Sequence, residues 1–344
     1  MGDVGAFRFY LIYEYRILLI LKLNKKMKTL TVFTPAYNRA HTIGRTYHSL
    51  CVQTSHDFEW LVVDDGSTDG TKELITSYLT NIEYVDDCEL YGYSFDAPWL
   101  KVHYIYQQNQ GMHGAHNTAY DAIHSELNTC IDSDDYMPDD AVEKILNFWN
   151  SLSNERKNKC AGIIALDVDD KNLKVIGYEL PTDRKSTTLS GYYERGGKGD
   201  KKLIYRTEVI KSTPRYPIFE GEKYVGLGYK YRLIDQQYEL LILNEPVCIV
   251  DYQLDGSSHS MYKQYWNNPR GWAFSRKNEM QYTKSLKRKL LVCAHYVSSC
   301  IGFKNIHFLS ESPCKFLTFL SIPLGVVMHF YIKYKVKNNA IFKM

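Results

Sequence analysis

Apolar runs of strand length alternate with amphipathic stretches between residues 27 and 150. Runs rich in β-branched and aromatic residues occur at 30–34, 60–63, 102–106 and 127–131. Stretches with helical spacing of apolar residues follow them at 41–53, at 71–79, in the segment that ends near 123, and at 138–149. Regular alternation of strands and helices predicts an α/β fold with a Rossmann-like, mostly parallel central sheet flanked by helices.

Two segments do not fit this alternation. Residues 81–101 are rich in tyrosine and aspartate and are predicted to form a loop insertion. Residues 186–200 are polar and rich in glycine, and they predict a mobile loop.

Each of the four predicted strands ends in a polar cluster. These clusters are 35–38, 64–69, 108–117 and 132–135. Because the carboxyl ends of parallel strands meet at one edge of a sheet, the four clusters are expected to form one site. An apolar and aromatic ledge beside carboxylates fits a nucleoside diphosphate whose charge is neutralised by a metal ion.

The last cluster is the most acidic, with Asp132, Asp134 and Asp135 within four residues. Carboxylates this close repel one another unless a cation or solvent surrounds them. Mg²⁺ and Mn²⁺ favour oxygen ligands and share one or two carboxylates with substrate phosphates. The alternative is an acidic turn that caps the helix starting near Pro138, and Asp135 could serve both purposes.

Composition narrows the possible functions. A chain of 344 residues with 44% apolar and 24% charged residues can build one large domain with appendages. The net charge of +3 is too small to indicate a nucleic-acid partner. The 8 cysteines are scattered without metal-ligand spacing, which disfavours a zinc site or disulfide scaffold and fits a reducing cytoplasm.

Both ends of the chain differ from the middle. Residues 1–26 are predicted to be a dispensable upstream extension, with an amphipathic membrane-contacting helix as the alternative. Residues 316–332 are mostly apolar and precede Lys333, Lys335 and Lys337, and Glu311 is the single acid in 281–344. This pattern predicts a kinked helix lying in the membrane interface, with an ordinary buried helix as the alternative.

Four segments together resemble an inverting family 2 glycosyltransferase of the GT-A fold. They read TVFTPAYNRAHTI, WLVVDDGSTDGT, NQGMHGAHNTAYDAIHSE and CIDSDDYMPDDAV, and the resemblance covers about residues 29–150 and continues more weakly to about 258. The chain resembles bacterial enzymes that build capsular polysaccharide, exopolysaccharide or lipopolysaccharide. The resemblance implies metal-dependent transfer from a UDP-sugar to a saccharide, linkage of that acceptor to a lipid, and a cytoplasmic location on the inner face of the cell membrane.

The resemblance also implies a domain division and a set of site residues. Residues 27–137 would form the nucleotide-sugar half of a catalytic domain, 138–260 the acceptor half, and 261–344 a helical membrane-associating region. The implied nucleotide-sugar residues are Pro35, Tyr37, Asn38, Asp64, Asp65, His113, Asn117, Asp132, Ser133 and Asp134. The implied ligands of Mn²⁺ or Mg²⁺ are Asp132, Asp134, Asp135 and His259. A structural cap is the alternative for Asp64, and hydrogen bonding at a helix start is the alternative for His113 and His116.

The general base is the least defined part of this site. Inverting transfer needs a group that accepts the proton of the acceptor hydroxyl, and a carboxylate is the expected choice. Related sequences carry an acid shortly after an EGEK-like segment, whereas residues 224–228 contain none here. The candidates are Glu222, Glu220 and Asp235, each of which could instead be a surface charge. The departure supports a second hypothesis, a sugar-nucleotide or glycan-binding protein that has lost catalysis.

Overall fold

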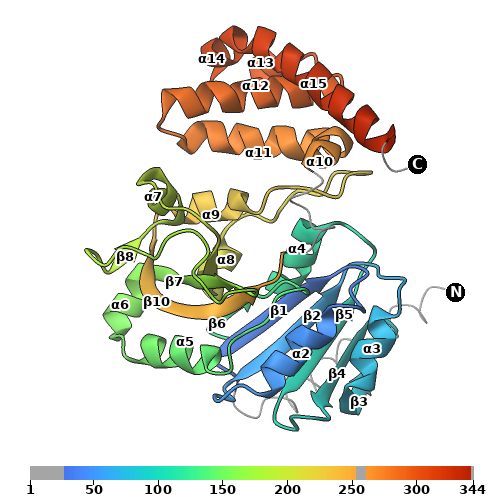
Figure 1. The fold of residues 1–344 in the computed structure, drawn as a ribbon, viewed down its shortest axis with the longest axis vertical. Coiled ribbons are helices and arrows are strands. Elements are labelled where there is room, and N and C mark those ends of the chain that lie inside the picture. Colours follow the sequence, from blue (N-terminus) through green and yellow to red (C-terminus); the bar gives the residue numbers. More distant parts are fainter. Residues whose placement is uncertain (1–26, 253–260, 342–344) are drawn as a thin grey trace, which may run out of the picture.

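The computed structural model describes residues 27–252 and 261–341 (Figure 1). The predictions for residues 1–26 and for His259 lie outside the described residues. Helices flank both faces of a ten-stranded sheet, which confirms the α/β class.

The sheet has the strand order β3-β4-β5-β2-β1-β6-β9-β7-β10-β8. The strands are β1 (Leu30–Ala36), β2 (Phe58–Asp64), β3 (Leu79–Tyr84), β4 (Glu89–Ser94), β5 (Lys101–Tyr106), β6 (Leu127–Cys130), β7 (Cys160–Asp169), β8 (Ser186–Thr187), β9 (Lys201–Arg206) and β10 (Glu239–Val250). The four predicted strands of the first half are all present, as β1, β2, β5 and β6.

The prediction of a mostly parallel sheet is wrong, because the sheet is mixed. Only the pairs β5–β2, β2–β1, β1–β6 and β7–β10 are parallel. The other neighbours pair antiparallel, and β9 does so on both of its sides, with β6 and with β7. Apolar periodicity marks a strand but carries no information on its direction.

Residues 81–101 are not a loop insertion. Strands β3 and β4 form an antiparallel hairpin that extends the sheet beyond β5. Side chains of β4 alternate between buried and half-buried, the pattern of a strand with one covered face. Tyr91 of this strand stacks on His103 of β5 with ring centroids 4.1 Å apart.

Residues 186–200 also contain regular structure, namely β8 and helix α7 (Leu189–Glu194). The Tyr192 hydroxyl donates to the carbonyls of Tyr178 and Lys198, each at 3.0 Å. A Cβ on Gly177 would lie 2.1 Å from the Lys198 carbonyl oxygen, so glycine permits these two backbones to cross. The segment is therefore packed against its neighbours.

Helices cover the two faces of the sheet with separate apolar clusters. One face is covered by α2 (Ile43–Cys51), α3 (Thr71–Ser77) and α5 (Ala141–Asn150). The other is covered by α4 (Met112–Ala122), α7, α8 (Thr207–Ser212) and α9 (Gly228–Ile234), while the short α6 (Asn154–Lys159) leads into β7. The helices expected near 41–53, 71–79, 123 and 138–149 are thereby confirmed.

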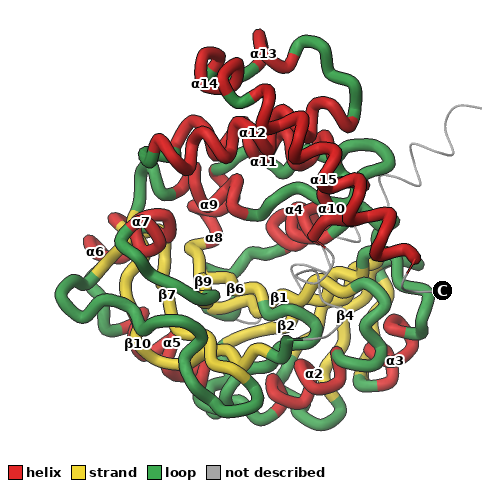
Figure 2. The backbone as a smooth tube through the Cα atoms, turned by 45° about the horizontal axis from the view of Figure 1, so that its top comes forward, coloured by secondary structure: helices red, strands yellow, loops and turns green. Residues whose placement is uncertain are grey.

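The remaining helices form a layer on the α9 side of the sheet, as Figures 1 and 2 both show. They are α10 (Met261–Asn267), α11 (Pro269–Tyr282), α12 (Leu286–Gly302), α13 (Phe308–Glu311), α14 (Lys315–Leu320) and α15 (Ile322–Ile341). The single kinked helix predicted for 316–332 is two helices, and Pro323 falls in the first turn of α15, where no backbone N–H is needed. Within 27–252 and 261–341, no helix is both long and apolar enough to cross a bilayer.

Candidate active site

The carboxyl ends of β1, β2, β5 and β6 meet at one edge of the sheet, because these four neighbours run parallel. The backbone N–H of Asp65 donates to the Ala36 carbonyl at 2.7 Å, and that of Gln107 donates to the Asp64 carbonyl at 2.9 Å. The loops after β1, β2 and β5 are therefore joined by hydrogen bonds into one surface.

Asp64 and Asp65 hold these loops in place with their side chains. Asp64 accepts from the Ser67 N–H at 2.8 Å and from the Tyr104 hydroxyl at 2.6 Å. Asp65 accepts from the Gln107 amide at 2.6 Å and from the backbone N–H groups of Gln110 and Gly111 at 2.8 and 2.7 Å. Burial raises the pKa of Asp65, and these hydrogen bonds act in the opposite direction.

The loop after β1 places one aromatic ring in solvent at this edge. Pro35 is buried at the end of β1, whereas Tyr37 is 51% exposed. Asn38 adopts a left-handed conformation with φ 52°, and its carboxamide oxygen accepts from the Thr68 N–H at 2.8 Å. Bonding to the loop after β2 stabilises this uncommon conformation and leaves the Tyr37 ring available to a planar ligand.

The acidic segment 132–135 follows β6 as a tight turn in which the Asp135 N–H donates to the Asp132 carbonyl at 2.9 Å. Ser133 is buried, whereas Asp132 and Asp134 are half-buried. Burial, followed by the charge of Asp132, raises the pKa of Asp134. Burial also raises the pKa of Asp135 to about 8, opposed by the charge of Lys202.

Asp135 lies within the protein below this turn. Its carboxylate accepts from the backbone N–H of Asp251 at 3.1 Å and lies 3.9 Å from the Cys248 sulfur. The Thr46 hydroxyl of α2 donates to its carbonyl at 2.7 Å. The structure therefore gives Asp135 contacts that support the turn, while Asp132 and Asp134 retain exposed surface.

Three residues far away in sequence complete the surroundings of the acidic segment, and sequence reasoning missed them. Arg45 of α2 donates to the Asp134 carbonyl at 2.9 Å and to the Asp251 carboxylate at 2.6 Å. Lys202 of β9 donates to the Cys130 carbonyl at 3.2 Å. Asp251 follows β10 at the same edge, so the rule that found the other clusters would have identified it.

His113, His116 and Asn117 of α4 are buried. The Asn117 carboxamide donates to the Tyr216 carbonyl and accepts from the Tyr216 N–H, each at 2.9 Å. His113 accepts from the Val225 N–H at 3.2 Å, and His116 lies 3.2 Å from the Tyr120 hydroxyl. Burial lowers the pKa of His113 to about 4 and that of His116 to about 3, so both rings are neutral.

The three carboxylates predicted as the base differ in their contacts. Glu222 is 6% exposed and accepts from the backbone N–H groups of Arg270 and Gly271 at the start of α11, at 3.0 and 2.8 Å. Asp235 accepts from the backbone N–H groups of Leu189 and Ser190 at 3.1 and 2.8 Å. Glu220 is exposed, and its carboxylate has no hydrogen-bond partner among the described residues.

The donor set of the acidic segment suits a hard cation. Asp132 and Asp134 are adjacent, half-buried carboxylates whose mutual repulsion a cation would relieve. Over the described ranges, no three His, Cys, Asp or Glu side chains are grouped to hold a metal ion. One or two carboxylates suffice when the oxygens of a diphosphate supply the other ligands.

Comparison with known proteins gives the family. Residues 31–156 match the model of glycosyl transferase family 2. A putative teichuronic acid biosynthesis glycosyltransferase of Bacillus subtilis, TuaG, is 32% identical over 124 residues, which are 36% of this chain and 42% of that protein. An uncharacterised glycosyltransferase of a Nostoc species is 28% identical over 196 residues, 55% of this chain and 53% of the relative. The chain thus spans about half the length of these curated relatives.

Similarity to solved structures concerns the fold alone. The crystal structure of residues 1–349 of S. aureus TarS in complex with UDP-GlcNAc has a TM-score of 0.52 and 17% sequence identity. The alignment covers 86% of this chain and 79% of that one. Residues 31–156, which contain all four polar loops of the site, belong to glycosyltransferase family 2.

Proposed function

We propose that this protein transfers a sugar from a UDP-sugar to a hydroxyl group of a saccharide, with inversion at the anomeric carbon. The observation that supports the proposal most is the position of the half-buried Asp132 and Asp134 at the edge where the loops after β1, β2 and β5 are joined. Carboxylates and an exposed aromatic ring at the same edge of the sheet match the charge and shape of a nucleoside diphosphate with its cation. S. aureus TarS, whose fold this chain resembles, was crystallised with UDP-GlcNAc, a donor of this class.

Asp132 and Asp134 are the residues proposed to hold Mn²⁺ or Mg²⁺, with Asp135 supporting the turn below them. When bound, the cation would neutralise negative charge on the diphosphate leaving group. Tyr37 would contact the uracil ring, and Asp65 would keep the loops that surround it in position. Arg45 would fix the acidic segment through the Asp134 carbonyl.

In the proposed reaction, the acceptor oxygen forms a bond to C1 while the bond from C1 to the phosphate oxygen breaks, and the hydroxyl proton passes to a carboxylate. Glu222 and Asp235 already accept two backbone N–H groups each, which occupies their carboxylate oxygens. Glu220 is therefore the first of the three candidates to test as the base.

The substitution Asp134→Asn tests this function. It removes one charge from the proposed cation site, so release of UDP from UDP-sugars with Mn²⁺ or Mg²⁺ should fall at least ~100-fold. Asp139→Asn is the matched control, because Asp139 is an exposed carboxylate close to the same segment. Undiminished UDP release by Asp134→Asn would refute the assignment of the donor site.

A second function is favoured by one observation. Residues 226–228 at the start of α9 include no carboxylate. The carboxylates of Glu222 and Asp235 accept hydrogen bonds from backbone N–H groups at the starts of α11 and α7. A protein that binds a sugar nucleotide without transferring the sugar would have these features. Metal-dependent UDP binding in calorimetry, with no transfer across a panel of donors and acceptors, would favour this function over the first.

The acceptor is proposed to be linked to a lipid, and the protein to act as a peripheral protein at the inner face of the cell membrane. The support for this proposal is the apolar and basic C-terminal region.

A further inference from the structure

Exposed apolar side chains are concentrated on α14 and α15. Of the 24 large hydrophobic side chains that are exposed in the described parts of the chain, 8 lie between residues 316 and 334. They are Phe316, Phe319, Leu320, Leu324, Val327, Phe330, Tyr331 and Tyr334, here called the outer apolar face. Scattered exposed apolar residues are ordinary, but a contiguous group of this kind indicates an interaction surface.

The packing of α14 and α15 fixes this face toward solvent. Thr318, Ser321, Gly325 and Ile332 are buried on the opposite side. A Cβ on Gly325 would lie 2.5 Å from the Val297 Cβ, so α15 is in close contact with α12 at this glycine. Leu324, Val327, Tyr331 and Tyr334 follow one another at intervals of three or four residues, which places them on one side of α15. Rotation of α15 about its own axis would break this contact with α12, so these side chains remain exposed to solvent.

The charged side chains of α14 and α15 are all positive. Lys315, Lys333 and Lys337 are exposed, and the Lys335 ammonium lies 5.6 Å from the centre of the Tyr331 ring. The sequence contains no Asp or Glu after Glu311, whose carboxylate pairs with Lys277 at 3.3 Å. A second copy of the chain would bring lysines against lysines, whereas anionic lipid headgroups complement both the charge and the apolar character.

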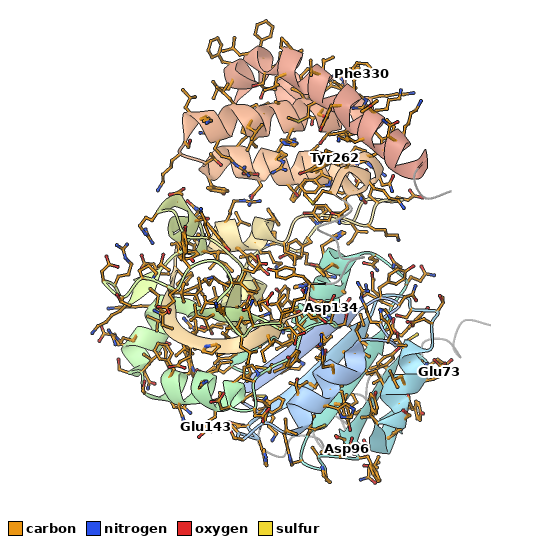
Figure 3. The ribbon with its side chains drawn as sticks, in the orientation of Figure 1. Glu73, Asp96, Asp134, Glu143, Tyr262 and Phe330 are labelled. Carbon is orange, nitrogen blue, oxygen red and sulfur yellow. The ribbon has the colours of Figure 1, made fainter. Side chains whose placement is uncertain are left out.

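We propose that the outer apolar face binds the surface of an anionic lipid bilayer, as a peripheral contact. The aromatic and aliphatic side chains would enter the boundary between headgroups and acyl chains, and the lysines would contact lipid phosphates. Phe330 lies at the outer end of the molecule and Tyr262 lies between it and Asp134 (Figure 3), so the bound bilayer would be on the side of the C-terminal helices. This inference deepens the membrane association put forward with the proposed function and rests on it, but it does not depend on the chemistry proposed for the donor site.

The full-length protein should co-sediment with vesicles that contain phosphatidylcholine and phosphatidylglycerol, and bind vesicles of phosphatidylcholine alone much more weakly. The combined variant Phe316→Ser, Phe319→Ser and Phe330→Ser should weaken binding to the anionic vesicles at least ~10-fold, because it removes three inserted rings. Phe95→Ser is the matched control, since Phe95 is 71% exposed and Phe316 is 72% exposed. Thermal melting checks that each variant folds.

Charge is tested separately from apolar contact. Lys333→Glu and Lys337→Glu should each weaken binding to the anionic vesicles about fivefold or more. The double variant should also show a smaller loss of vesicle binding as the salt concentration rises. Reversing the exposed Lys171 and Lys174 should have no such effect. Neither pair belongs to the donor site, so UDP binding should be unchanged in all variants.

Two results would overturn the proposal. The first is absence of binding to anionic vesicles by the unmodified protein, or binding that the phenylalanine variant retains in full. The second is a concentration-dependent dimer in sedimentation velocity that the same variant disperses, without vesicle binding, because it would assign the face to a second copy. Failure of the donor site would appear instead as absence of UDP binding with vesicle binding intact.

Discussion

The resemblance assigns Asn117 to the donor, whereas the structure shows its carboxamide bonded to the backbone of Tyr216 on both sides. Both residues are 2% exposed, so water cannot replace these bonds when the side chain is removed. Each unpaired buried backbone group costs roughly 1–3 kcal/mol. Asn117→Ala should therefore lower the free energy of unfolding by about 2–6 kcal/mol, a large part of the total of a typical domain.

The chain contains a matched control for this substitution. Asn244 makes the same pair of bonds, to the N–H and carbonyl of Leu180 at 2.9 and 2.8 Å, but its side chain is only half-buried. Leu180 is itself 2% exposed, but removal of the half-buried Asn244 side chain opens its backbone groups to solvent, so the cost should be only about 1 kcal/mol. The difference between the two variants measures the contribution of burial.

Urea denaturation followed by circular dichroism gives both free energies, and calorimetry with UDP gives the donor affinity. If Asn117 acts by holding Tyr216, Asn117→Ala should mainly lower the free energy of unfolding. Its affinity for UDP should then change only to the extent that the loop between α8 and α9 moves. A variant with full stability and at least ~10-fold weaker UDP binding would refute this reasoning and support direct contact with the donor.

Three further substitutions test other contacts of the site. In the folded protein, burial lowers the pKa of His116 from 6.5 to about 3, so the ring is neutral there. Below pH 6.5 the unfolded chain binds a proton at this residue and the folded protein does not. The contribution of His116 to the free energy of unfolding is therefore complete above pH 6.5 and is lost as the pH falls. Between about pH 7 and about pH 5 the unmodified protein should lose about 2 kcal/mol more than His116→Phe in urea denaturation, and parallel losses would contradict this. Glu222→Gln should cost about 1–3 kcal/mol in the same assay by weakening the bonds to the start of α11, whereas unchanged stability with lost turnover would identify Glu222 as the base. Gly111→Ala would place a Cβ 2.0 Å from the Lys223 carbonyl oxygen. Its melting temperature should therefore fall well below that of the control Gly221→Ala, because Gly221 also has a positive φ but nothing lies within 4 Å of its added Cβ. Equal melting temperatures of the two variants would show that the loop adjusts.

The sequence by itself predicted the strands and helices between residues 30 and 150, with the exception of the hairpin formed by β3 and β4. Apolar runs such as 60–63 are buried in parallel strands, and a polar segment follows each of these strands. The four polar loops could be assigned to one edge from the sequence alone, because the carboxyl ends of parallel strands lie at the same edge of a sheet. The α/β class and the position of the acidic segment follow from these local signals.

Tertiary structure alone decided the direction of β9 and the partners of the polar side chains. Arg45 meets Asp251 across 206 residues, Lys202 meets the end of β6, and Glu222 meets the start of α11, 48 residues later. No periodicity encodes such pairs, because each depends on where the backbone brings two distant segments together. For the same reason the sequence placed an apolar helix at 316–332, but only its packing against α12 determined which side chains remain in solvent.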